Sequence, residues 1–123
     1  MKHYSKLKET KISSKTLYEG ILNVKLDEVR LINGNTSSRL YFDHRGASGI
    51  LPVEDGNVYL VQQFRYPIGQ TTWEIPAGKR EENQTFLMCA EAELKQETGL
   101  TAQHLQEIMV FHPCNAFSNE VQH

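Results

Sequence analysis

The sequence has no long apolar run, no surplus of charge of either sign and no secretory signal. Its 123 residues carry 13 basic and 15 acidic side chains, a formal net charge of −2, so neither nucleic acid nor an anionic membrane is expected as a partner. No stretch approaches the roughly 18 apolar residues of a membrane span. Residues 1–15 are basic but lack the apolar segment of a signal peptide. These absences predict a cytoplasmic protein.

Cysteine and histidine are scarce, and neither shows the spacing of a metal site. Cys89 and Cys114 could form one disulfide bond. Cys89 has apolar neighbours within a predicted helix, which favours a reduced cysteine in the core, and Cys114 is interpreted as a loop residue. The five histidines are given no role. The length allows one small domain with a modest core.

The first third of the chain has the pattern of antiparallel strands. Residues 1–15 are polar and lysine-rich, and we expect a loose arm or a short edge strand there. Alternation of apolar and polar residues begins at Thr16, and its interruption between Leu26 and Val29 predicts a bulge or a switch of faces. Asn33-Gly34 predicts a type I′ hairpin turn into a strand over residues 38–43. Such a unit has little core of its own.

The rest of the chain combines strand patterns with one helix, which predicts a mixed α/β or α+β domain. Strands and turns are expected at residues 47–53, at the Asp55-Gly56 turn, at 58–65, at 71–75 and at 105–111. The apolar run at residues 58–61 is typical of a central strand covered on both faces. We expect that strand to end at Pro67, residues 76–78 to form a turn, and a loop to begin at Pro113.

The second half of residues 78–100 predicts a helix that ends at Thr98-Gly99. Glu93 and Glu97 fall on one stripe of that helix, together with Phe86 and Ala90. Two like charges one turn apart cost a few tenths of a kcal/mol on a bare helix. A hard divalent cation reverses that sign, because Mg²⁺ prefers carboxylate oxygens. The pair therefore suggests metal-assisted chemistry on a charged oxygen substrate.

These residues resemble the Nudix box, a glycine, five residues, a glutamate, seven residues, and then Arg-Glu-apolar-any-Glu-Glu-any-Gly-apolar. The positions that match are Gly78, Glu93, Leu94, Glu97, Gly99 and Leu100. Three positions depart from the pattern, because Gln84 and Gln96 replace glutamates and Ala92 replaces the arginine. The spacing is intact over the whole motif.

The resemblance covers most of the chain and is most similar to the ADP-ribose pyrophosphatase branch. Three further segments carry it, namely VQQFRYP at 61–67, WEIPAG at 73–78 and FSNE at 117–120. It implies a Nudix fold, with a mixed sheet packed on the Nudix helix in residues 44–123 and an antiparallel unit before it in residues 1–43. It also implies a homodimer in which the N-terminal sheet reaches over the partner. The C-terminal part of the family's fold is expected to be missing.

The resemblance further implies the roles of individual residues. Glu93 and Glu97 are expected to act in catalysis and, with the carbonyl of Ala77, to bind Mg²⁺ or Mn²⁺; Gln96 stands at a catalytic position. The expected substrate-binding residues are Arg65, Trp73, Glu74 and Glu120. Trp73 could stack on adenine or be a buried aromatic beside a strand. Glu74 could orient Arg65, orient a ligand or be exposed.

The expected reaction is metal-assisted hydrolysis of the diphosphate of ADP-ribose, a small-molecule substrate, to AMP and ribose 5-phosphate. Glutamine keeps one carbonyl acceptor but loses the charge that binds Mg²⁺ tightly. Ala92 removes an orienting ion pair. We therefore expect reduced or absent activity. Two alternatives are a Nudix-fold module that binds a nucleotide or a protein without hydrolysis, and a hydrolase of another nucleoside diphosphate derivative such as a nucleotide sugar.

Overall fold

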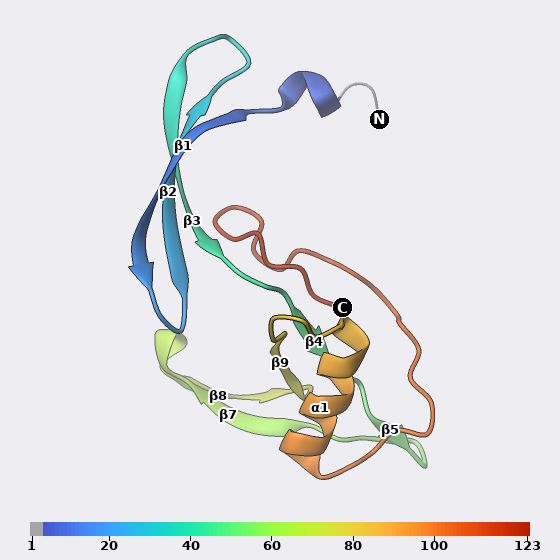
Figure 1. The fold of residues 1–123 in the computed structure, drawn as a ribbon. Coiled ribbons are helices and arrows are strands. Elements are labelled where there is room, and N and C mark those ends of the chain that lie inside the picture. Colours follow the sequence, from blue (N-terminus) through green and yellow to red (C-terminus); the bar gives the residue numbers. More distant parts are fainter. Residues whose placement is uncertain (1–3) are drawn as a thin grey trace. The chain divides into compact units, whose positions relative to one another are not determined.

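The computed structural model describes residues 4–123 and divides them into two units, which are treated separately below (Figure 1). The first unit contains the chain up to His44 together with Cys114–Glu120, and the second contains Arg45–Pro113 together with Val121–His123. Strands and a single α-helix in the described residues give a mixed α+β fold, as the sequence predicts. The assignment of residues 1–43 and 44–123 to two domains stays a prediction.

The first unit is built on a three-stranded antiparallel sheet in the order β1-β2-β3 (Figure 1). A short 3₁₀ turn, η1 (Tyr4–Leu7), precedes the strands β1 (Thr10–Glu19), β2 (Asn23–Arg30) and β3 (Thr36–Asp43). Of the two alternatives for residues 1–15, the edge strand is present from Thr10 onward, because β1 lies at the edge of the sheet. This strand continues past Thr16 to Glu19, and a turn separates it from β2. All ten residues of β1 are exposed, so no apolar periodicity marks that strand in the sequence.

Of the two alternatives predicted between Leu26 and Val29, a bulge is absent from β2 and a switch of faces is confirmed, because residues three apart in a regular strand lie on opposite faces. The pairing of β2 with β3 is continuous, and the irregular steps of this sheet lie in β1. Asp27 explains the break in the apolar pattern. It is buried, with 6% of its surface exposed, and it accepts a hydrogen bond from the Tyr41 hydroxyl at 3.0 Å. A buried polar residue thus stands where the alternation would have an apolar one.

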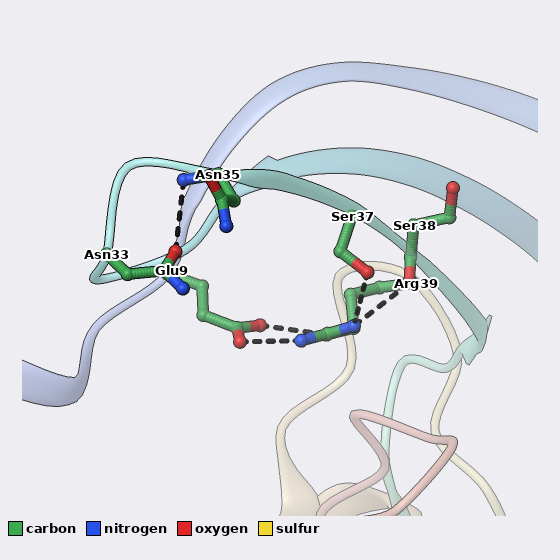
Figure 2. Close-up of polar contacts among 6 residues, drawn as sticks. All are labelled: Glu9, Asn33, Asn35, Ser37, Ser38 and Arg39. Carbon is green, nitrogen blue, oxygen red and sulfur yellow. Dashed lines mark hydrogen bonds and ion pairs between the residues drawn. The ribbon is translucent and has the colours of Figure 1, made fainter.

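The hairpin at Asn33-Gly34 is confirmed, but its turn is not type I′. Gly34 has a φ of 87°, whereas Asn33 does not adopt a positive φ. The Gly34 N–H donates to the Leu31 carbonyl at 3.0 Å, and the Leu31 N–H donates to the Asn35 carbonyl at 2.7 Å. This is a three-residue loop with glycine in the left-handed position. Figure 2 shows why it is favoured, because the Asn33 side chain accepts from the Asn35 N–H at 3.0 Å.

An ion pair fixes the residue before β1 to β3. Arg39 donates through Nε and Nη2 to the two carboxylate oxygens of Glu9, at 2.8 and 2.6 Å (Figure 2). The hydrogen bond from Arg39 lowers the pKa of Glu9, and the same bond raises the pKa of Arg39. The pair is exposed, so it sets the direction of the chain more than the stability of the sheet.

The strands of the second unit form three two-stranded pairs: β4 (Ala47–Gly49) with β9 (Ala77–Lys79), β5 (Val53–Glu54) with β6 (Asn57–Val58), and β7 (Val61–Arg65) with β8 (Gln70–Glu74). The predicted Asp55-Gly56 turn is confirmed, and both residues have positive φ, as a type I′ turn requires. The prediction for Pro67 is also confirmed, because β7 ends at Arg65 and the 3₁₀ turn η2 (Tyr66–Ile68) follows.

Three other strand predictions were wrong. Residues 58–65 are not one central strand, because the Tyr59 N–H donates back to the Pro52 carbonyl and the run 58–60 is exposed. Residues 76–78 contribute to strand β9 rather than to a turn, since β4 supplies a pairing partner. Residues 105–111 form no strand: within the described residues only Phe111 pairs, with Gln122. An apolar run in the sequence indicates that a segment is hydrophobic, but it does not show which strand lies beside that segment.

The helix α1 (Phe86–Thr98) follows the prediction closely. Thr85 caps its start by accepting from the Met88 N–H at 3.0 Å, and Gly99, with a φ of 77°, ends it. The helix packs on β4 and β9 through buried Cys89 and Leu94, so Cys89 is a reduced core cysteine as expected. Among residues 4–123, no helix is both long and apolar enough to cross a membrane.

Candidate active site

Helix α1 holds Glu93 against the backbone of β9. A Cβ atom built on Gly78 would lie 2.0 Å from the Glu93 Cδ and 2.2 Å from its Oε1. No side chain can occupy position 78 while the Glu93 carboxylate stays in this place. Gly78 does not adopt a positive φ, so space, and not backbone conformation, calls for glycine there. The first glycine of the motif is therefore explained by its contact with the motif's glutamate.

The carboxylate of Glu93 lies in an unfavourable electrostatic environment. Burial raises its pKa most, and the negative charges of Glu97 and Glu81 raise it further. Glu81 was not among the residues proposed from the sequence. The sequence gives no signal for it, because only the folded loop shows that its charge acts on Glu93. Two further carboxylates, those of Glu97 and Glu81, thus act on Glu93.

These oxygens suit a hard divalent cation only in part. Among residues 4–123, no three His, Cys, Asp or Glu side chains are close enough to form a metal site by themselves. Mg²⁺ in proteins is commonly held by one or two carboxylates together with substrate phosphates. Glu93 and Glu97, one turn apart, with the backbone at Ala77 beside Gly78, fit that kind of incomplete site. The cation would also relieve the repulsion that raises the pKa of Glu93.

Arg65 and Glu74 lie on the same face of the β7–β8 ribbon. The register pairs Gln63 with Thr72 and Val61 with Glu74, so alternate residues share that face. Arg65 donates to the Glu74 carboxylate through Nε at 2.8 Å and through Nη2 at 2.5 Å. The Thr72 hydroxyl donates to the same carboxylate at 2.5 Å. The bonds from Arg65 and then from Thr72 lower the pKa of Glu74 to about 2.

The guanidinium of Arg65, held by Glu74, is close enough to helix α1 to feel the charge of Glu97. An open cavity of about 280 Å³ is lined by Val61, Gln62, Gln63 and Glu97. Arg65 is also within electrostatic reach of Glu97: its pKa is raised chiefly by the Glu74 hydrogen bond and additionally by the Glu97 charge. The structure therefore brings together Arg65, Glu74, Glu93 and Glu97, four of the residues proposed from the sequence.

Two residues proposed from the sequence, Trp73 and Glu120, are not part of this group. Trp73 pairs with Gln62, so it lies on the face of the ribbon opposite Arg65. It is 65% exposed, and the alternative of a buried aromatic is wrong. Glu120 belongs to the first unit, where its Oε1 lies 3.3 Å from Nε2 of His44. The ligand-binding roles of both residues stay predictions.

Two of the three departures from the motif have a visible structural setting. The side-chain Oε1 of Gln84 accepts a hydrogen bond from the Glu81 N–H at 2.9 Å. The backbone carbonyl of Gln84 accepts one from Nη1 of Arg80 at 2.9 Å. Gln84 thus closes the loop before the helix. Gln96 is exposed and Ala92 half-buried on α1; the structure offers no reason for alanine at position 92.

The comparison with protein families agrees with this geometry. The model of the NUDIX domain matches residues 43–123. The chain belongs to the Nudix family. An ADP-ribose pyrophosphatase from Bacillus subtilis is 37% identical over 119 residues, which is 95% of this chain and 64% of that protein. The ADP-ribose pyrophosphatase of Mycobacterium tuberculosis is 35% identical over 89% of this chain and 54% of its own length.

Two further matches extend the comparison. A methanol dehydrogenase activator from Bacillus methanolicus is 31% identical, covering 94% of this chain and 63% of that protein. The crystal structure of an ADP compounds hydrolase superimposes with a TM-score of 0.80 and 18% identity, over 94% of this chain and 64% of that one. This likeness shows the Nudix fold. The chain spans less than two thirds of the length of each of these proteins.

Proposed function

We propose that this Nudix domain hydrolyses the diphosphate of ADP-ribose, giving AMP and ribose 5-phosphate, with Mg²⁺ or Mn²⁺ as the cofactor. The observation that supports the proposal most is the Glu93 carboxylate held on Gly78, with Glu97 on the next turn beside Arg65. Two relatives named ADP-ribose pyrophosphatase support the choice of substrate.

Each residue then has a defined task. Glu93, Glu97 and the Ala77 carbonyl would hold the cation, which neutralises phosphoryl charge and lowers the pKa of bound water. Arg65 binds the diphosphate through charge-assisted hydrogen bonds. Glu81 adds negative charge near Glu93 and so strengthens cation binding.

Gln96 limits the rate. It occupies a position where the motif has a glutamate, and its neutral amide can neither take a proton as a carboxylate does nor hold a cation as strongly. Gln84 lacks the same charge and is engaged in the loop. We therefore propose turnover below about 1 s⁻¹, the lower end of typical enzyme rates.

The test follows AMP release from ADP-ribose in the presence of Mg²⁺. We expect slow release that is lost in Glu97→Gln. Glu54→Gln, which alters a surface carboxylate on the β5–β6 hairpin, is the matched control and should leave the rate unchanged. Turnover well above 1 s⁻¹ would contradict the role given to Gln84 and Gln96. Release that survives Glu97→Gln would contradict the proposed site.

A second candidate is a module that binds the nucleotide without hydrolysing it. The specific observation in its favour is that the described side chains form no three-residue metal site. Calorimetry separates the two functions. A binder keeps its affinity for ADP-ribose when Mg²⁺ is omitted and releases no AMP, whereas the hydrolase binds in a Mg²⁺-dependent way.

We also propose that the chain forms a homodimer through the sheet of strands β1, β2 and β3 in its N-terminal part. That sheet exposes large apolar side chains, among them Ile12, Leu17, Tyr18 and Leu40, and it has few buried residues. Light scattering tests the proposal. We expect a dimer at micromolar concentration and a shift to monomer in Leu17→Glu; a monomeric wild type contradicts it.

A further inference from the structure

The position of the Arg65 guanidinium depends on the partners of the side chain. Arg65 is the last residue of β7, it pairs with Gln70, and the 3₁₀ turn η2 follows it. Its side chain is about half exposed. A long, flexible side chain at the end of a strand samples many rotamers unless a partner restricts it. A defined phosphate contact therefore needs something else to fix the guanidinium.

Glu74 supplies that restriction from the other end of the ribbon. Glu74 lies on β8 and pairs with Val61 of β7, which precedes Arg65 by four residues on the same strand. For Nε and Nη2 of Arg65 to reach the Glu74 carboxylate, the Arg65 side chain must lie back along the ribbon toward Val61. Val61 and Gln63 line the cavity that also contains Glu97. The two-point ion pair therefore places the positive charge next to that cavity.

Thr72 completes the arrangement. Its hydroxyl donates to the Glu74 oxygen that also accepts from Nε of Arg65, so the carboxylate itself is fixed. The ion pair uses Nε and Nη2 of Arg65. Among residues 4–123, Nη1 of Arg65 makes no hydrogen bond, and it remains available to an oxygen anion. The low pKa of Glu74 is consistent with a carboxylate that stays ionised in this role.

We propose that Glu74 and Thr72 are positioning residues, which hold the Arg65 guanidinium along the β7–β8 ribbon so that Nη1 meets a phosphate oxygen in the cavity beside Glu97. The functional part of this inference rests on the proposed diphosphate hydrolysis. In this account Glu74 contacts Arg65 and not the substrate. Glu74 partly neutralises the charge of Arg65, but it also fixes the guanidinium before the phosphate binds. The second effect outweighs the first, because the two-point pair through Nε and Nη2 leaves Nη1 oriented and charged.

The first experiment measures ADP-ribose binding by calorimetry with Mg²⁺ present. Glu74→Gln should weaken binding about tenfold, the size of one charge-assisted hydrogen bond, and Thr72→Val about threefold. In an Arg65→Ala background, Glu74→Gln should change the affinity less than twofold, because the positioning acts only through Arg65. Glu54→Gln is the control and should bind as the wild type does. If turnover is measurable, KM should rise while kcat changes little.

Two results overturn the inference. One is unchanged or tighter binding in Glu74→Gln, and the other is an equal loss with and without Arg65. A second measurement needs no ligand: the Nε–H resonance of Arg65 should exchange slowly in the wild type and in Glu54→Gln, and rapidly in Glu74→Gln. A rapidly exchanging Nε–H in the wild type rejects the positioning role, even if ADP-ribose binds. Absence of ADP-ribose binding in the wild type rejects the proposed function, and the resonance still decides the positioning.

Discussion

The contact between Gly78 and Glu93 predicts a large effect from the addition of a single methyl group. A Cβ at position 78 would lie 2.0 Å from the Glu93 Cδ, and ordinary contact begins near 3.4 Å. In Gly78→Ala the carboxyl must therefore move by about 1.4 Å. Because it is the far end of a flexible side chain, we expect the free energy of unfolding to fall by only ~1 kcal/mol, the lower end of overpacking costs. A displacement of this size can cost ~100-fold in catalysis.

The matched control is Gly49→Ala on the neighbouring strand β4. Its Cβ would lie 2.8 Å from Cδ1 of Ile75, again the end of a flexible side chain, so the stability loss should be similar while Mg²⁺ affinity is retained. Urea unfolding gives the stability, and calorimetry gives the Mg²⁺ affinity. In a Glu93→Ala background, Gly78→Ala should cost almost nothing. Equal Mg²⁺ affinities in the two alanine variants, or the same stability loss without Glu93, would refute the reasoning.

Three further predictions concern the framework around the site. Thr85→Ala should lower the free energy of unfolding by ~1 kcal/mol through loss of the helix cap, with Thr85→Ser close to wild type in urea unfolding; equal stability of all three proteins contradicts this. Leu94→Ala, at a side chain with 3% exposure, should cost about 2–5 kcal/mol, whereas the 56% exposed Leu87 should tolerate alanine within ~0.5 kcal/mol. The Asn119 amide is the main cause of the lowered pKa of Asp43, so Asn119→Ala should raise that pKa in a carbon-13 NMR titration. A group whose pKa is lower in the folded state stabilises the protein above its unfolded pKa, and this stability is lost as the pH falls through the folded pKa. The Asn119→Ala variant should therefore lose less stability than the wild type on acidification. An unchanged Asp43 titration midpoint in the variant would count against the contact.

The sequence predicted where turns occur and where elements end better than it predicted which strands pair. Gly99, Asp55-Gly56 and Pro67 act through backbone conformations that depend on one or two residues, and each ends or turns an element as expected. The extent of strand β1 and the run at residues 105–111 were mispredicted in opposite directions. Strand β1 is exposed along its whole length yet paired, whereas the run is apolar and, apart from Phe111, unpaired. Pairing depends on which strands lie alongside.

The candidate site was predictable as far as the motif spacing reached. Glu93, Glu97 and Arg65 could be proposed from their positions. In the structure the charge of Glu97, which lines the cavity, acts on both Arg65 and Glu93. Glu81 could not be proposed in this way, because only the folded loop shows that its charge acts on Glu93. The assignment of Glu74 to Arg65 needed the register of β7 and β8, since nine residues separate the two in the chain. The same register places Trp73 on the face of the ribbon opposite Arg65.

The most direct test of the central claim compares AMP release from ADP-ribose by the wild type and by Glu93→Gln, each with and without Mg²⁺. Glutamine keeps the size of the side chain on Gly78 and removes only its charge. We expect slow, Mg²⁺-dependent release by the wild type and none by Glu93→Gln, with both proteins equally folded. Release that is independent of Mg²⁺, or equal in the two proteins, would contradict the assignment of this helix as the catalytic element.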